Sequence, residues 1–314
     1  MTDDARPDEG QVLRAQSGFY VVGAPDGPVT AVLRGRLKKE RLETGLVALG
    51  DRVRFERLAR PEGDSGAVDA VITEVLPRGS VLARRAPGPR GVWAQDVIVA
   101  NVERLMPVLA ARHPPPNWRL LDRFLALAEI DAIACVVVVN KVDLGVDDGV
   151  AAAVACYRRV GYEVLCLSAA TGEGMESLRD ALRDRVSAVV GPSGVGKSSL
   201  LNAVDPELGL RVGEVSQAVD KGRHTTRVAE LHPLSFGGLV ADTPGLRELG
   251  VWQVDPGLLE WAFVEFRAHL HHCRFDDCTH DHEPKCAVRQ AVERGEVSLE
   301  RYESYRALLH EDSR

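Results

Sequence analysis

Residues 191–198 are the segment of this sequence whose types and spacing point most directly to a chemistry. The segment reads Gly-Pro-Ser-Gly-Val-Gly-Lys-Ser and matches the pattern G-x-x-x-x-G-K-[ST] of phosphate-binding loops. Glycines let backbone N–H groups turn toward phosphate oxygens, and the N-terminus of a following helix adds partial positive charge. An apolar strand at 187–190 and a helix at 199–204 are expected on either side. This context predicts a nucleotide phosphate site.

Two side chains at the end of the loop could act on the phosphates and their metal ion. Lys197 is expected to reach the β- and γ-phosphates, and the Ser198 hydroxyl to bind magnesium. We expect Lys197 to contribute to catalysis as well. The predicted phosphate contacts are Gly191, Pro192, Ser193, Gly194, Val195, Gly196, Lys197, Ser198 and Ser199.

Two further segments indicate that the base is guanine. Asn140-Lys141-Val142-Asp143 ends an expected strand at 133–139 and matches the motif N-K-x-D. The Asp143 carboxylate can accept hydrogen bonds from the ring N–H and the exocyclic amine of guanine, and adenine would leave it unpaired. Ser168-Ala169-Ala170 follows an expected strand at 163–167 and matches the short motif that closes over guanine. The predicted base contacts are Asn140, Lys141, Val142, Asp143, Ser168 and Ala169.

The order of these motifs along the chain is unusual. Asp242-Thr-Pro-Gly245 matches D-x-x-G, in which Asp242 contacts magnesium through water and Gly245 senses the γ-phosphate. Ordinary GTPases begin with the phosphate loop and end with the guanine motifs, whereas here the guanine motifs come first and D-x-x-G last. A circular permutation preserves such a site because the termini of a domain lie at its surface and often close together. The sequence predicts a circularly permuted α/β P-loop GTPase domain.

A cluster of cysteines and histidines near the C-terminus suggests a metal site. Cys273, Cys278, His280 and Cys286 have the spacing Cys-x4-Cys-x-His-x5-Cys. Three thiolates with one imidazole suit a tetrahedral structural zinc ion. A disulfide would leave one cysteine over and needs an oxidising compartment, which nothing in the sequence indicates. Spacing alone leaves open which histidine is the fourth ligand, since four others lie nearby: His269, His271, His272 and His282.

The rest of the chain predicts two more domains. Short alternating segments separated by Gly, Pro and Asp turns indicate an OB-type β-barrel, with strands at 11–16, 19–22, 29–33, 52–58 and 67–76. The expected organisation is a disordered acidic tail at 1–10, the barrel at 11–77, a linker at 78–92, the GTPase domain at 93–252 and a helical zinc-binding domain at 253–314.

Composition and charge restrict the function. Apolar residues make up 45% of the chain and charged residues 27%, as in soluble α/β proteins. The longest apolar run, 132–139, is too short to cross a bilayer, and the polar N-terminus is no signal peptide, so a cytoplasmic protein without membrane contact is expected. The net charge is −7, yet residues 11–90 carry +5, with five basic residues at 34–41. From the residues alone, this basic run is equally a solvated loop or a nucleic-acid contact.

Together, these features resemble the circularly permuted GTPases that act on the small ribosomal subunit (RsgA-type). The likeness extends from about Leu13 to Leu309 and includes the barrel, the rotated motifs, Gly222-Arg-His-Thr-Thr226 and the Cys/His cluster. The resemblance implies hydrolysis of GTP to GDP and phosphate, stimulated by the small subunit, and a role in late maturation of that particle. It also implies contact with ribosomal RNA and favours His280 as the fourth zinc ligand. A monomer is expected.

The resemblance also assigns two catalytic residues to the loop before D-x-x-G. It makes Thr226 the switch threonine that contacts magnesium and His224 the candidate for ordering the attacking water. Many GTPases carry a water-orienting glutamine after D-x-x-G, and this chain has Leu246 there. Leucine can neither donate nor accept a hydrogen bond, so low intrinsic activity, completed by another group or a partner, is expected. The alternative is that His224 is an exposed loop residue without a catalytic part.

Two rival functions remain open at this point. One is a scaffold that binds GTP and RNA but turns over negligibly, which Leu246 would permit. The other is a GTPase that acts on a different nucleic acid or on a protein. Turnover measured with and without purified small subunits distinguishes all three.

Overall fold

The structure is a computed structural model that describes residues 7–35, 37, 47–58, 68–87, 93–211, 230–242 and 256–311. The chain forms two compact units, each described by itself. Unit 1 contains residues 1–103, 182–188 and 220–246. Unit 2 contains residues 104–181, 189–219 and 247–314.

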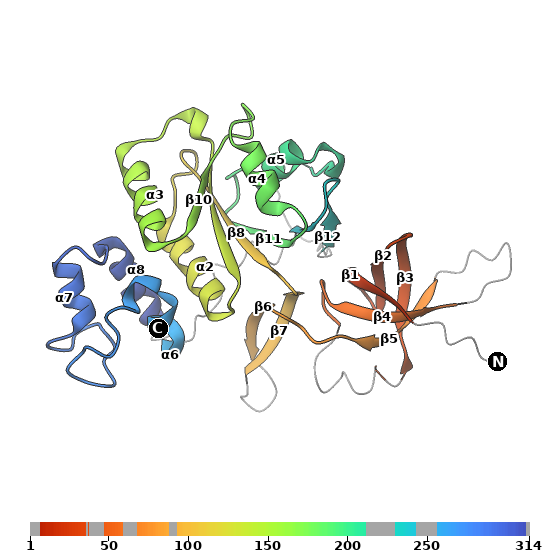
Figure 1. The fold of residues 1–314 in the computed structure, drawn as a ribbon, viewed down its shortest axis with the longest axis horizontal. Coiled ribbons are helices and arrows are strands. Elements are labelled where there is room, and N and C mark those ends of the chain that lie inside the picture. Colours follow the sequence, from red (N-terminus) through yellow and green to blue (C-terminus); the bar gives the residue numbers. More distant parts are fainter. Residues whose placement is uncertain are drawn as a thin grey trace, which may run out of the picture. The chain divides into compact units, whose positions relative to one another are not determined.

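Unit 1 begins with a five-stranded barrel, as the sequence predicts (Figure 1). Its strands are β1 (Asp8–Gln16), β2 (Phe19–Ala24), β3 (Gly27–Leu33), β4 (Arg52–Arg57) and β5 (Ala70–Val75). The barrel closes because β1 pairs with both β2 and β4, while β5 lies between β3 and β4. Alternate residues of these strands point inward and form one core that includes Val12, Val22, Phe55 and Ile72.

Two expected boundaries of the barrel region are wrong. Strand β1 starts at Asp8, inside the expected disordered tail, because Asp8 and Glu9 pair in register with Phe55 and Arg54 of β4. The expected linker contains β6 (Val81–Pro87), which forms an antiparallel hairpin with β7 (Trp93–Ala100). Leu82 and Val99 are opposite each other in this hairpin and both are fully buried, so apolar burial outweighs the Pro- and Gly-rich composition.

Unit 1 also contains three short strands from the permuted domain. Strand β11 (Val186–Val190) begins in this unit and runs parallel to β13 (Leu239–Asp242), with Ala188 opposite Ala241. Strand β12 (Glu230–Pro233) pairs antiparallel with β13 and, through Glu230, with Arg14 of β1.

Unit 2 is built on three parallel strands in the order β10-β9-β8. These are β8 (Arg104–Ala110), β9 (Ala134–Asn140) and β10 (Glu163–Cys166). Figure 1 shows α2 (Trp118–Ile130) and α3 (Asp148–Val160) on one side of the strands, with α4 (Met175–Leu182) and α5 (Lys197–Val204) on the other. Strand β9 is apolar along most of its length because helices cover both faces of a parallel sheet.

The C-terminal part of unit 2 is helical. It consists of α6 (Pro256–Ala262), α7 (Ala287–Glu293), α8 (Leu299–Leu309) and the single turn η5 (Val264–Phe266). Its core is aromatic, with Phe266 in edge contact with Tyr305 and with Phe263 and Tyr302 close by. In the part of the chain that the structure describes, no helix has the length and apolar character needed to span a bilayer.

Candidate nucleotide-binding site and metal centre

The phosphate loop connects β11 to α5, and its glycines are required by close packing. Gly191 has φ 140°, and a Cβ at this position would lie 2.3 Å from the carbonyl oxygen of Val108 at the end of β8. Gly196 has φ 95°, and a Cβ there would lie 2.5 Å from Nδ2 of Asn140. Both positions combine a left-handed backbone with no room for a side chain. The loop therefore lies directly against the ends of two neighbouring strands.

Asn140, the last residue of β9, joins the phosphate loop to the guanine-type loops. Its side chain is buried, Nδ2 donates to the Val195 carbonyl at 2.8 Å, and Oδ1 accepts from the Ala169 N–H at 3.2 Å. Val142 completes the connection, since its N–H donates to the Leu167 carbonyl at 3.3 Å. The polar atoms of Asn140 are thus used within the protein, and this residue shapes the site by holding three loops together.

Lys141 and Asp143 are held in defined positions on either side of Val142. Lys141 has φ 65°, and its Nζ donates to the carbonyls of Gly194, at 2.6 Å, and of His113. The buried Ser168 hydroxyl donates to Oδ1 of Asp143 at 2.5 Å, while its oxygen accepts from the N–H groups of Ala170 and Thr171. Asp143 itself is exposed. Its carboxylate is therefore oriented by the protein and open to a base from solvent.

Lys197 lies over the phosphate loop. Its Nζ donates to the carbonyls of Gly191 and Pro192, at 2.7 and 2.8 Å, so the ammonium group is drawn back onto the loop. Ser198 and Ser199 follow in the first turn of α5, where both are half-buried, and Ser193 is exposed at the tip of the loop. A bound anion could therefore contact the Lys197 ammonium group, a serine hydroxyl and the N-terminus of α5, all within one helical turn.

Some predicted site residues cannot be placed. His224, Thr226, Gly245 and Leu246 lie outside the described residues. Asp242 is the last residue of β13, and the pairing of β13 with β11 places it at the carboxyl end of the strand beside the one that leads to the phosphate loop. Ligands of parallel α/β sheets bind at this edge.

Sequence reasoning missed His113. Its carbonyl accepts from Lys141, and it lies in the loop that follows β8. The available signal was positional, because this loop begins at the carboxyl end of a parallel strand, where binding loops of such sheets gather.

The four residues of the Cys/His cluster are brought together in unit 2. The ligand atoms of Cys273, Cys278, His280 and Cys286 all lie within 4.8 Å of one another. Nδ1 of His280 is 3.5 Å from Sγ of Cys273 and 3.4 Å from Sγ of Cys286, and these two sulfurs are 3.9 Å apart. Tetrahedral ligands at Zn–S and Zn–N bond lengths of about 2.3 and 2.0 Å would be separated by similar distances. The cluster could hold one metal ion.

A carboxylate outside the cluster orients its histidine. Nε2 of His280 lies 2.9 Å from Oε2 of Glu260 on α6, and the ring is buried. A metal-binding histidine usually donates its other ring N–H to such a carboxylate, which fixes the tautomer and ring orientation. His269, His271, His272 and His282 are outside the cluster. Glu260 was missed from the sequence because it lies 20 positions before His280, on helix α6, outside the Cys/His segment.

The chemistry of the thiols also fits a cation. Burial raises the pKa of the Cys278 thiol and of the Cys286 thiol. The apoprotein would therefore keep these groups protonated, and a bound cation reverses that preference. Backbone N–H groups of Ala287 and Arg289 point at Sγ of Cys273 and Cys286, at 3.3 and 3.5 Å, where they would stabilise thiolates.

The fold and the two sites define a class of protein. A phosphate loop braced by guanine-type loops, with the motifs in rotated order behind a five-stranded barrel, is the architecture of a circularly permuted P-loop GTPase. The chain belongs to the RsgA GTPase family: the sequence profile of the RsgA GTPase matches residues 75–252, and that of the RsgA N-terminal domain matches residues 9–64.

Relatives and solved structures agree with this assignment. The chain is 48% identical over 303 residues to the "Small ribosomal subunit biogenesis GTPase RsgA" of Gemmatimonas aurantiaca, covering 96% of each chain. It is 38% identical over 303 residues to the protein of that name from Caldanaerobacter subterraneus, covering 96% of this chain and 95% of the relative. Among solved structures it is similar to YjeQ from Thermotoga maritima, with TM-score 0.77, 34% identity and coverage of 97% and 98%. It is also similar to YloQ, "a circularly permuted GTPase", with TM-score 0.74, 30% identity and coverage of 100% and 98%.

Proposed function

We propose that this chain is a GTPase of small ribosomal subunit biogenesis, which hydrolyses GTP to GDP and phosphate and is stimulated by the subunit. The observation that supports GTP binding is that the guanine-type loop is hydrogen-bonded directly to the phosphate loop. Asn140 donates to the Val195 carbonyl, and Lys141 donates to the Gly194 carbonyl. The relatives, named as small ribosomal subunit biogenesis GTPases, supply the partner. The partners proposed are the subunit and its RNA, acting on a cytoplasmic monomer.

In this proposal, residues of the chain bind the guanine base, the phosphates and the magnesium ion of GTP. Asp143, held by Ser168, accepts from the ring N–H and amine of guanine. Backbone N–H groups of residues 191–198 surround the phosphates, and Lys197 exchanges its two carbonyl partners for phosphate oxygens. Magnesium, which neutralises charge on the β- and γ-phosphates when bound, would be held by Ser198 and Thr226, with Asp242 in contact through water.

The catalytic step needs a group that orients water. Leu246 occupies the position of the usual glutamine and cannot do this, so we assign the role to His224. His224→Ala should lower subunit-stimulated turnover by about 10²-fold, within the range for a general acid–base group, and leave GTP affinity within a few-fold. Stimulated turnover equal to that of the native protein would make His224 only a loop residue.

We propose zinc as the ion of the Cys/His cluster, with a structural role. All four ligand positions are filled by Cys273, Cys278, His280 and Cys286, which leaves no open position for a substrate and is the arrangement of structural zinc sites. Metal analysis of the freshly purified protein should find one equivalent of zinc.

The barrel is the proposed contact with ribosomal RNA. The basic run at 34–41 stands out in an acidic chain, and Arg34, just after β3, is exposed and forms a 3.5 Å ion pair with Glu56. The other members of this run, Arg36, Lys38, Lys39 and Arg41, lie outside the described residues. Reversing Arg36 and Lys38 to glutamate should weaken subunit binding and flatten its salt dependence, because fewer counterions are released. Reversing the exposed Arg159 and Arg294 is the matched control.

One experiment tests the whole proposal. GTP and ATP turnover is measured with the purified protein alone and after addition of small ribosomal subunits. We expect GTP hydrolysis that rises with subunits and negligible ATP hydrolysis. GTP turnover that subunits do not change would indicate a GTPase with another partner, and negligible turnover under both conditions would indicate a scaffold. Equal use of ATP and GTP would refute the guanine assignment itself.

A further inference from the structure

Helix α8 contacts the metal loop, the segment 273–286 that carries the four Cys/His ligands, with one of its faces. The Tyr302 hydroxyl donates to the carbonyl of the metal-cluster residue His280, and the Tyr305 hydroxyl donates to the carbonyl of Thr279, each at 2.7 Å. Both rings pack against Phe266 beneath the loop. A displacement of the metal loop would therefore move α8 or break these two hydrogen bonds.

Next to Tyr305 on the same face of α8, one turn earlier, a buried arginine reaches the nucleotide-binding part of unit 2. The Arg301 side chain is only 3% exposed. Its Nη1 donates to Oδ1 of Asp122 on α2 at 2.7 Å, and its Nε and Nη2 donate to the two carboxylate oxygens of Glu265 at 2.6 and 2.8 Å. The guanidinium also lies 4.7 Å from the ring centroid of Phe263. Burial lowers the pKa of Arg301, but Asp122 and Glu265 outweigh it and raise that pKa well above its ordinary value.

Asp122 joins the two helices that leave the guanine site. The same Oδ1 that accepts from Arg301 accepts from the Tyr157 hydroxyl of α3 at 2.7 Å, so one buried carboxylate connects α2, α3 and α8. Helix α3 starts just after the guanine-type loop, and Asp147 caps it by accepting from the Val150 N–H. Helix α2 is capped by Asn117 at the end of the loop whose His113 carbonyl accepts from Lys141.

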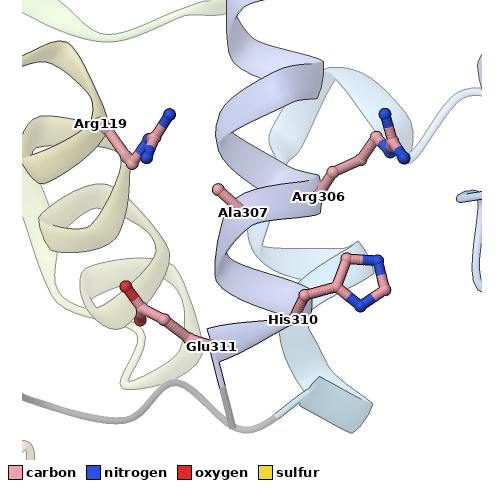
Figure 2. Close-up of a pocket in the computed structure, with 5 residues that line it drawn as sticks. All are labelled: Arg119, Arg306, Ala307, His310 and Glu311. Carbon is pink, nitrogen blue, oxygen red and sulfur yellow. The ribbon is translucent and has the colours of Figure 1, made fainter. Parts of the chain in front are cut away.

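The contact between α2 and α8 is open at its other end. A hollow of about 380 Å³ lies between them there, lined by Arg119, Arg306, Ala307, His310 and Glu311. Figure 2 shows Arg119 on α2 facing the last turns of α8, with Ala307 between them and His310 directed away. An ion pair between Arg123 and Glu311 lies at this end. In the described residues, the Arg301–Asp122 pair differs from this one because both of its side chains are almost fully buried, whereas Glu311 is 47% exposed.

We propose that Arg301 is a positioning residue that couples the metal loop to the guanine site through Asp122, α2 and α3. The inference rests on the proposed function, because it assumes that residues 140–143 bind guanine. When the metal loop is ordered, α8 holds Arg301 against Asp122, and the helices that carry the loops around Lys141 and Asp143 are fixed in the conformation that binds the base. Loss of metal-loop order releases this restraint, and guanine nucleotide affinity falls.

The charge of Arg301 supports a positioning role over simple packing. Well-packed apolar residues usually hold two helices together at least as well as a buried ion pair, which gives up much solvation. The bidentate pair with Glu265 of η5 instead fixes the direction of the guanidinium, and that direction sets where its remaining bond, to Asp122 of α2, can form. Such a contact is either made or broken, which is the property a coupling element needs.

The test is thermodynamic linkage measured with GDP and zinc. The dissociation constant of GDP is determined for the full chain with zinc bound and after zinc removal by a chelator. We expect the native protein to bind GDP about fivefold more weakly without zinc, at the low end of usual coupling strengths. Arg301→Met should bind GDP equally in both states, at the weaker affinity. Arg267→Met is the matched control, since it breaks an exposed ion pair from Arg267 to Glu129 of α2, 2.6 Å long, and should keep the fivefold difference.

A second variant keeps the test decisive if Arg301→Met fails to fold. In that variant the buried carboxylates of Asp122 and Glu265 lose their cation, so the triple change Arg301→Met, Asp122→Asn, Glu265→Gln removes all three charges together. It should keep one zinc and lose the linkage. By reciprocity, GDP should tighten zinc binding by the same factor in the native protein only.

The outcomes separate the two claims. GDP binding that is unaffected by zinc in the native protein, or a full fivefold difference in the Arg301 variants, overturns the coupling while the proposed function stands. A native protein that binds no GDP overturns the proposed function first, and the coupling with it.

Discussion

The phosphate loop, residues 191–198, and the metal loop, residues 273–286, are two ligand-binding loops of the same unit that are held in different ways. The phosphate loop is fixed mainly by close backbone packing, with Gly191 and Gly196 against β8 and β9, and its carbonyls accept from side chains of the guanine-type loop such as Asn140. Its surroundings are the buried, apolar strands of a parallel sheet. The metal loop is fixed by side chains, with four ligand atoms converging on one point and Glu260 and Tyr302 outside them.

This difference predicts how each loop depends on its ligand. The nucleotide loop is positioned by a core that forms without nucleotide, so removal of GDP should leave the domain folded. The metal loop places three thiols around one centre, and burial raises the pKa of two of them, Cys278 and Cys286. A bound cation would stabilise the thiolates and join the four ligands, so the ion is part of the fold.

The largest expected effect comes from removing a metal ligand. Cys278→Ser replaces a thiolate with a hydroxyl that stays protonated, and a structural zinc contributes about 10–16 kcal/mol, more than a typical domain's whole stability. We expect no bound zinc and loss of protection from hydrogen exchange in α7 and α8. GDP should still bind, within the fivefold loss expected from linkage. Cys156→Ser, outside the cluster, is the control. A zinc-free Cys278→Ser protein with α7 and α8 still protected would contradict the claim that the metal loop needs its ion to fold.

Lys197→Ala should have the next largest effect and act in the opposite way. The ammonium group is lost from the transferring phosphate, which by analogy with other electrostatic donors costs about 10²–10³-fold in kcat. Because backbone holds the loop, the melting temperature without nucleotide should change little. The measurements are subunit-stimulated turnover and thermal melting. A large drop in melting temperature would show that the loop depends on this side chain after all.

Asp143→Asn tests whether the Asp143 carboxylate determines which base is bound and is not needed for the fold. An amide donor would face the guanine N–H, and losing hydrogen bonds to a charged group costs about 1.5–3 kcal/mol, or roughly 10- to 100-fold in GTP affinity. Xanthine nucleotides, which present a carbonyl at that position, should gain correspondingly. Competition binding with GDP and XDP measures both. Unchanged preference for GDP would remove Asp143 from the base site.

The smallest of these effects is expected at Glu260, beyond the metal ligands. Glu260→Gln removes the negative charge opposite Nε2 of His280 but can still accept its hydrogen bond, so zinc affinity should fall by about tenfold, the lower end for such partners. Glu296→Gln is the matched control, because Glu296 lies 3.8 Å from His269, a histidine outside the cluster. Zinc competition with a chromogenic chelator gives both affinities. Equal losses in the two variants would show that Glu260 acts only through surface charge.

Sequence patterns could predict the parts of this fold whose signals are local. Alternation predicted the five barrel strands within a few residues, and apolar runs predicted β9, β10 and β11. Hairpin β6-β7 was missed because the stretch 77–91, which contains β6 and leads into the turn, is rich in Pro, Gly and Arg, while the evidence for the hairpin is the burial of Leu82 and Val99, which face each other across the pair. Asp8 and Glu9 were placed in a tail because pairing with β4 depends on residues 45 positions or more away.

The sequence by itself determined the ligand-binding motifs. They are a phosphate loop, a guanine-type loop in rotated order, and three cysteines with a histidine at metal-binding spacing. These motifs are readable because each consists of neighbouring residues whose chemistry depends on local spacing. Only the tertiary structure decided what supports them. The Asn140–Val195 bond, the His113 carbonyl under Lys141, Glu260 behind His280 and the buried Arg301–Asp122 pair all join residues distant in sequence. Burial in a shared core selects such pairs, because a buried polar group must find a partner wherever the chain brings one.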